Sequence, residues 1–255
     1  MKNFKLFTFL VVISFLLFAC KKEDENPNVA ETGTVKLIMT HRWDVTNTTN
    51  FLLDLPLFHP VTNDTLTFTT LKYYLSNVRL KKADGTWWVH PESYFLVDLS
   101  EPTSYELAIP NVPIGNYSAM EYTLGVDSLR NVSGAQGGAL SISNNMFWSW
   151  NTGYIMTKAE GISNNSSSGS FSFHLAGFEG PDNVVTKRTF DFITQIPLTV
   201  KNGKVIEVHY TVNPMHLWDN SPSVSVLNNI ATTGTEAKTM ALAFYNSIVF
   251  DHFHE

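Results

Sequence analysis

The sequence predicts an all-β fold, a single-domain antiparallel β-sandwich with a short C-terminal helix. Stretches with a period of two, in which apolar and polar residues alternate, recur from residue 33 to residue 212. Turn signals such as Asp84-Gly85 and Pro113-Ile114-Gly115 separate these stretches. No helical pattern of comparable length competes with them before residue 235. Many short strands divided by glycine and proline turns are typical of a sandwich.

The first expected strand begins near residue 33. Val35, Leu37, Met39 and His41 fall on one of its faces, so His41 ends an apolar face. Further strands are expected at 64–70, 72–82, 86–90, 93–99, 117–126, 153–159, 170–176, 189–200 and 204–212.

Two local signals organise the last part of the chain. The dipeptide Asn202-Gly203 predicts a tight hairpin between its flanking strands, because both residues tolerate the positive φ of a type I′ turn. Met240, Phe244 and Ile248 recur every four residues within 235–249. This spacing predicts the short C-terminal helix.

The N-terminus has the pattern of a lipoprotein signal. A positively charged start precedes the apolar run 6–19, and Leu17-Phe18-Ala19-Cys20 fits a lipobox. Residues 1–19 are therefore expected to be a signal peptide and Cys20 the lipidated residue, whereas an uncleaved anchor or a core helix is the alternative. Residues 20–33 are polar and predict a flexible tether. The sandwich domain is then 34–255.

This leader predicts a protein of the cell envelope, anchored by lipid to the outer membrane and either periplasmic or surface-exposed. Removal of residues 1–19 takes away two of the 17 basic residues and none of the 23 acidic ones, which leaves 15 and 23, a net charge of −8. That balance argues against nucleic-acid binding. Because Cys20 is the single cysteine, the domain has neither a disulfide nor a thiolate metal ligand.

The eight histidines are the main candidates for chemistry, since neutral imidazole is the commonest side-chain metal ligand. Imidazole without thiolate suits copper better than calcium. No histidine pair has the i, i+4 spacing of a zinc protease helix, so a site must be assembled from separate strands. There is also no nucleotide-binding glycine loop and no nucleophile elbow, and we expect a protein that is not an enzyme.

Four histidines are the candidate metal ligands. His41 precedes Trp43 by two residues and is either a ligand or a hydrogen-bonded histidine at the edge of the core. His174 alternates with three apolar residues and is expected to face the other side of its sheet. His252 and His254 share a face if the chain end is extended, and such pairs bind Cu(II) or Ni(II); the alternative is a frayed tail.

The stretch 146–161 contains two indoles, Trp148 and Trp150, which would share one face of a strand. Large core aromatics and the wall of a binding site are both compatible with this spacing. Several other motifs follow the same order along the chain as in one known family. They are Leu71-Lys72-Tyr73-Tyr74-Leu75-Ser76-Asn77-Val78, Tyr94-Phe95-Leu96-Val97-Asp98, Leu124-Gly125-Val126-Asp127, Gly138-Ala139-Leu140 and Phe173-His174-Leu175-Ala176-Gly177-Phe178.

Together with 146–161, these motifs resemble the MbnP-like family of periplasmic copper-binding proteins over about residues 34–255. The resemblance implies a non-catalytic protein that holds copper through two histidines beside a tryptophan oxidised to kynurenine. It also implies a dihaem cytochrome c peroxidase-like partner that oxidises the tryptophan. In this chain it favours His41 and His174 as ligands, with His252 or His254. The candidate tryptophans are Trp43, Trp88, Trp148 and Trp150.

A second hypothesis is an envelope lipoprotein that binds a glycan or a protein without metal. Trp87, Trp88 and Trp218 would then be exposed in a shallow groove, where they would stack on sugar rings or anchor an interface. It predicts scattered histidines, whereas the copper hypothesis predicts imidazole nitrogens close to a common point.

Overall fold

A computed structural model describes residues 30–148, 153–192 and 197–255 of the chain. It separates a unit Met1–Ala30 from a compact unit Glu31–Glu255, and the second unit contains the fold described below. Its strands are β1 (Thr32–His41), β2 (Pro56–His59), β3 (Asp64–Lys82), β4 (Trp87–Val89), β5 (Tyr94–Asp98), β6 (Glu106–Pro113), β7 (Gly115–Leu124), β8 (Ile155–Ile162), β9 (Ser170–Ala176), β10 (Thr186–Asp191), β11 (Leu198–Val200), β12 (Val205–Val212), β13 (Asn229–Ile230) and β14 (Val249–His254). Its helices are α1 (Ser128–Val132) and α2 (Thr235–Asn246), and its 3₁₀ segments are η1 (Pro102–Tyr105), η2 (Gly138–Leu140), η3 (Ile142–Asn144), η4 (Gly180–Asp182) and η5 (Pro214–Trp218).

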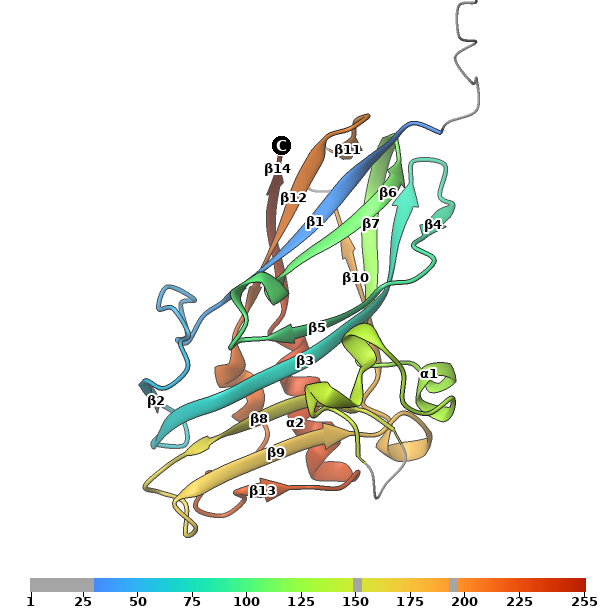
Figure 1. Cartoon of the computed structure of the whole chain (residues 1–255). Helices are drawn as coiled ribbons and strands as arrows, with labels where there is room; N and C mark the ends of the chain where they lie inside the picture. Colours follow the sequence, from blue (N-terminus) through green and yellow to red (C-terminus); the bar gives the residue numbers. More distant parts are fainter. Residues whose placement is uncertain (1–29, 149–152, 193–196) are drawn as a thin grey trace, which may run out of the picture. The chain divides into compact units, whose positions relative to one another are not determined.

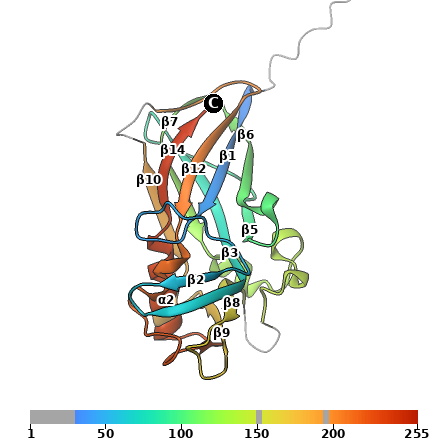
Figure 2. The ribbon, with the colours of Figure 1, turned by 90° about the vertical axis from the view of Figure 1, so that its left-hand side faces the viewer.

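The unit is mostly β and consists of two sheets (Figure 1). The smaller sheet has the order β14-β12-β1-β6, and Figure 2 shows β14, β12 and β1 side by side. β1 pairs with β12 in parallel, and in the larger sheet β13 pairs with β9 in parallel. The prediction of a purely antiparallel sandwich was therefore wrong: both sheets are mixed. Parallel neighbours need long connections, and alternation along one strand does not reveal them.

β3 is the centre of the larger sheet. It is 19 residues long and merges the two strands expected at 64–70 and 72–82. It pairs with β7 and β8 along its length and also with the short strands β2, β4 and β5. Because it spans the larger sheet, β3 connects the part that faces the smaller sheet to the part that faces α2 (Figure 1).

Two local expectations were wrong at the turns. β6 includes Pro110 and Pro113, which the sequence suggests are breaks; the strand lies at the edge of its sheet, where a missing N–H is tolerated. The chain does turn at Asn202-Gly203, but only Gly203 has positive φ. β11 then pairs with β7, and β12 with β1 and β14, so the turn connects two sheets instead of closing a hairpin.

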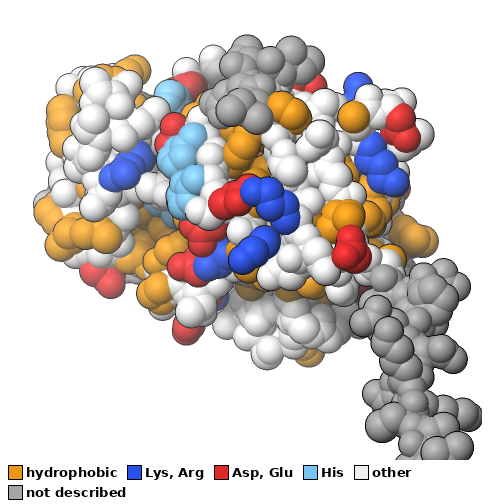
Figure 3. Space-filling model, turned by 90° about the horizontal axis from the view of Figure 1, so that it is seen from above, with side chains coloured by type: hydrophobic (Ala, Val, Ile, Leu, Met, Phe, Trp, Pro, Cys, Tyr) orange, Lys and Arg blue, Asp and Glu red, His pale blue; other side chains and the backbone are white. Residues whose placement is uncertain are grey.

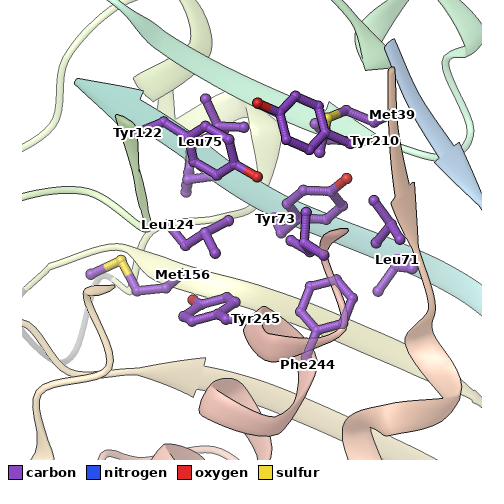
Figure 4. Packing of buried hydrophobic residues seen from close by; sticks show 14 of the residues in the cluster. Met39, Leu71, Tyr73, Leu75, Tyr122, Leu124, Met156, Tyr210, Phe244 and Tyr245 are labelled. Carbon is purple, nitrogen blue, oxygen red and sulfur yellow. The ribbon is translucent and has the colours of Figure 1, made fainter. Parts of the chain in front are cut away.

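The two sheets pack face to face through aromatic side chains. Tyr122 of β7 meets Tyr210 of β12 with ring centroids 5.6 Å apart, and Phe190 lies 4.9 Å from Tyr210. Figure 4 shows these tyrosines in one cluster with Tyr73 and residues of α2. Burial of large rings makes them the main apolar contribution to the core.

The expected C-terminal helix is confirmed as α2. Met240, Phe244 and Ile248 are fully buried, and Phe244 packs edge-on against Tyr73 at 5.3 Å (Figure 4). The helix ends at Asn246, and the chain continues into β14, a strand that the sequence pattern did not predict. No helix of the described residues is long and apolar enough to cross a bilayer.

Gly161 is required by a close approach between strands. A Cβ at this position would lie 2.2 Å from the carbonyl oxygen of Thr67 and 2.6 Å from the Phe171 ring. We expect Gly161→Ala to destabilise the protein by about 1–3 kcal/mol, because overpacking displaces backbone and ring. Chemical denaturation measures the loss, with Gly137→Ala as an uncrowded comparison at negative φ; equal stability of Gly161→Ala and wild type would contradict this packing.

Candidate metal centre

Three histidines meet on the outer face of the smaller sheet. His209 of β12 is the cross-strand partner of His252 of β14, and His254 follows two residues later on the same face. Alternation places the neighbouring Val208 and Tyr210 inside, where they are fully buried. Figure 3 shows histidine side chains gathered on one face, beside acidic and basic groups. Within the described residues these three form the one group of histidine, cysteine or acidic side chains able to share a metal ion.

The three imidazoles lie close together. Ring centroids are 4.5 Å apart for His209 and His252, 4.8 Å for His209 and His254, and 5.5 Å for His252 and His254. One nitrogen from each ring lies within 4.8 Å of the others. Metal–nitrogen bonds of about 2.0–2.1 Å require nitrogens roughly 3.3 Å apart in a tetrahedral site. The His209 and His252 rings are stacked with an interplanar angle of 3°, so their in-plane lone pairs run parallel and the rings must turn out of the stack to converge on one ion.

The surroundings favour neutral imidazole at His209. Burial lowers the pKa of His209, and the neighbouring His252 and His254 lower it further. Its Nε2 atom is buried and has no hydrogen-bond partner in the part of the chain that the structure describes. A buried nitrogen without a hydrogen bond, with a Glu207 carboxylate oxygen 3.5 Å away and two other imidazoles beside it, fits a metal ligand.

A β-bulge shapes the strand that carries two of these histidines. Phe253 pairs with Val208 and His252 with His209, but the next pair is Phe250 with Tyr210, so Asp251 has no cross-strand partner. Because the bulge leaves Asp251 out of the pairing, Phe250 and Phe253 both point inward, and both pack against Phe192, at 5.3 and 5.6 Å. The Asp251 carboxylate lies 3.2 Å from Nδ1 of His252.

His41 lies in the interior, apart from this group. Its side chain is 8% exposed, and its Nε2 is hydrogen-bonded to the Tyr73 hydroxyl at 3.0 Å. It packs edge-on against Tyr105 and lines an open cavity of about 280 Å³. Burial lowers the pKa of His41 to about 3. Its environment is that of a hydrogen-bonded core histidine, with a tyrosine hydroxyl as its partner.

His174 lies on the opposite face of the larger sheet. It is the cross-strand partner of Lys158, which in turn pairs with Lys72, so these side chains share the outer face. Tyr73 belongs to the inner face, where His41 contacts it. The expectation that His174 faces away from its apolar neighbours is confirmed. The structure does not bring His41 and His174 together, and their role as metal ligands stays a prediction.

His174 instead belongs to an ionic cluster. Its Nε2 lies 2.6 Å from a carboxylate oxygen of Glu160, and Lys158 lies 3.4 Å from the same oxygen. Hydrogen bonding from His174 lowers the pKa of Glu160. This ionic cluster is partly buried, and His174 and Lys158 both pair with the Glu160 carboxylate.

The predicted tryptophans are in separate places. Trp43 is buried, donates to the Phe58 carbonyl at 3.0 Å and packs against His59. Trp88 is half-buried, with its ring 5.8 Å from that of His90. Trp148 is buried. Trp150 lies outside the described residues, as do Cys20 and the expected signal peptide.

Comparison with known proteins decides the family. The family model described as MbnP matches residues 32–239, most of the chain. The chain belongs to the MbnP family. The resemblance seen in its motifs is thereby confirmed. MbnP from Methylosinus trichosporium has a similar structure, with 13% identity and a TM-score of 0.49, covering 81% of this chain and 83% of that one. No curated protein matches significantly in sequence.

The family match ends before two of the three clustered histidines. His252 and His254 follow residue 239, so the MbnP model does not cover them. Both are among the histidines that the sequence indicates as candidate ligands, whereas His209 is not, since alternation alone places it on the polar face of its strand. The sequence signal for His209 is its position on the outward face of β12. Periodicity does not reveal that β14, which carries the other two histidines, is the neighbouring strand.

Proposed function

We propose that this MbnP-family protein is a non-catalytic, copper-binding protein of the cell envelope, with His209, His252 and His254 as the metal ligands. The observation that supports this proposal is the convergence of three imidazoles on one sheet face, one of them with a buried nitrogen that lacks a hydrogen-bond partner among the described residues. The function would be to bind and hand on copper.

The donor set favours copper among the common metals. Imidazole nitrogens suit copper, nickel and zinc, while calcium and magnesium prefer oxygen ligands. At equal availability copper(II) binds nitrogen sites more tightly than the other divalent metals of its row. Family membership adds weight to copper over zinc.

The cellular setting follows from the leader and the family resemblance. We propose that Cys20 carries the lipid, that the protein is held at the outer membrane, and that a dihaem cytochrome c peroxidase-like enzyme is its partner. Labelling with a radioactive fatty acid in a host with a lipoprotein pathway tests the anchor, with Cys20→Ser as the control. Unlabelled wild-type protein would contradict it.

Copper titration of the purified protein tests the metal centre. We expect wild type to bind one Cu(II) per chain. The copper affinity should fall on the order of tenfold or more in His209→Ala or His252→Ala, because even residues that only hydrogen-bond to metal ligands change metal affinity about 10–100-fold. Metal analysis after gel filtration and competition with a chelator give stoichiometry and affinity.

His41→Gln and His174→Gln are the matched controls, because each replaces a histidine whose hydrogen-bond partner, Tyr73 or Glu160, is not part of the cluster. Both are expected to bind copper as wild type does. Loss of copper binding in either control variant, with binding unchanged in His209→Ala, would contradict the proposed ligands and indicate the replaced histidine as a ligand instead.

Two of the three tryptophans that the glycan hypothesis requires, Trp218 and Trp87, have surroundings that do not fit it. Trp218 is 1% exposed and cannot stack on a sugar. The face of Trp87 is covered by the Arg79 guanidinium, 4.3 Å from the ring centroid. Three of the histidines are clustered, which the metal-free hypothesis does not predict.

A further inference from the structure

Glu207 lies beside the three histidines on the same face of the smaller sheet. Residues 207 and 209 of β12 point to one side, and their cross-strand partners on β14 are His254 and His252. The four side chains therefore form a two-by-two array, with Cβ atoms of each pair roughly 5 Å apart. Three corners are imidazoles and the fourth is a carboxylate.

Glu207 and His209 are close enough to be neighbouring ligands of one ion. Oε2 of Glu207 lies 3.5 Å from Nε2 of His209, an ion-pair contact without hydrogen-bond geometry. Two atoms bound at about 2.0–2.1 Å in adjacent positions of a tetragonal site lie roughly 2.9 Å apart. The two atoms must therefore approach each other by about 0.6 Å to share an ion.

The nearest cation does not fully engage Glu207. Lys36 of β1 is 3.6 Å from Glu207 but makes its shorter contact with Glu106 of β6. The Glu207 side chain is one-third exposed, so it is free to change rotamer. A rotation toward β14 brings its carboxylate over the imidazoles without breaking the Lys36–Glu106 pair.

We propose that Glu207 supplies the fourth ligand, which makes the centre a three-nitrogen, one-oxygen site that selects Cu(II) over Cu(I). This inference rests on the proposed function. A carboxylate is a hard, charged ligand, and a tetragonal set of nitrogen and oxygen donors is typical of Cu(II), whereas Cu(I) prefers soft sulfur ligands. Glu207 is then the residue that sets the preferred oxidation state.

The test compares Glu207→Gln and Glu207→Asp with Glu101→Gln, which removes an exposed carboxylate between β5 and η1. Cu(II) and Cu(I) affinities are measured by chelator competition, the latter under anaerobic reducing conditions. We expect Glu207→Gln to weaken Cu(II) binding at least tenfold and Cu(I) binding less than threefold. Glu207→Asp keeps the charge but shortens the reach, so it should also weaken Cu(II) binding. Glu101→Gln should match wild type.

Electron paramagnetic resonance of the Cu(II) forms reports the donor set of the ion, and Glu207→Asp, which keeps the charge, separates a changed ligand from a changed charge. The copper hyperfine splitting is expected to change in both Glu207 variants and to stay at the wild-type value in Glu101→Gln. Wild-type affinity and spectrum in Glu207→Gln, or equal losses for both copper ions, would overturn the inference. If His209→Ala also bound copper as wild type does, the proposed metal centre itself would be contradicted. If His209→Ala lost copper but the Glu207 variants behaved as wild type, only the assignment of Glu207 as the fourth ligand would be contradicted.

Discussion

Lowering the pH from 6.5 to 4 is expected to reduce the free energy of unfolding by about 3 kcal/mol through His41 alone. Burial lowers the pKa of His41 to about 3, whereas an unfolded histidine titrates near 6.5. Between these values the unfolded chain binds a proton that the folded chain does not. Each pH unit in this window therefore costs up to about 1.4 kcal/mol, and the stability is fully present above pH 6.5.

Urea unfolding at several pH values, in wild type and His41→Gln, measures this contribution. Glutamine can keep a hydrogen bond to the Tyr73 hydroxyl but does not titrate, so the variant should show a shallower loss. The pKa values of Asp98 and Glu121 are lowered in the folded protein, so their contribution to the free energy of unfolding falls in acid. This contribution is the same in both proteins and cancels in the comparison. His216→Gln, a change near the surface, should keep the wild-type slope. An unchanged slope in His41→Gln would contradict the burial argument.

Replacing Trp218 by alanine is expected to destabilise the protein by about 3–5 kcal/mol. Trp218 is 1% exposed and lies at the end of η5. Its ring centroid is 6.1 Å from Phe68 of β3, 6.0 Å from Phe171 of β9 and 5.7 Å from Phe173 of β9. Truncation leaves a cavity among these rings, and the segment loses its main attachment to the larger sheet.

Trp218→Phe is the companion variant and should lose clearly less stability than Trp218→Ala. It keeps an aromatic ring, and the indole N–H that it removes has no hydrogen-bond partner among the described residues. Denaturant midpoints of the two variants measure the difference. A loss below about 1 kcal/mol for Trp218→Ala would mean that the site collapses without a cavity.

Alternation along single strands predicted much of this fold. β1, β9 and β12 each bury one face, and the sequence shows that directly in their period of two. The pairing of β1 with β12 could not be obtained this way, since it joins segments more than 160 residues apart in parallel. β14 was missed because a six-residue strand directly after a helix carries little periodic signal.

The candidate centre was predictable only in part. The expectation that His252 and His254 share a face in extended chain agrees with β14. His209 lies on the polar face of its strand, as the alternation in β12 indicates, but its role depends on which strand pairs next to it. His41 shows the converse: the sequence places it on an apolar face, and only the structure provides Tyr73 as its partner.

The bulge at Asp251 means that the terminal strand contains one residue more than its pairing requires. Deleting that residue would restore uninterrupted pairing, with Phe250 opposite Tyr210 and the following histidine still opposite His209. Both phenylalanines would stay inside and both imidazoles outside. The insertion is thus dispensable for side-chain parity, and what it adds is local twist and a carboxylate next to His252.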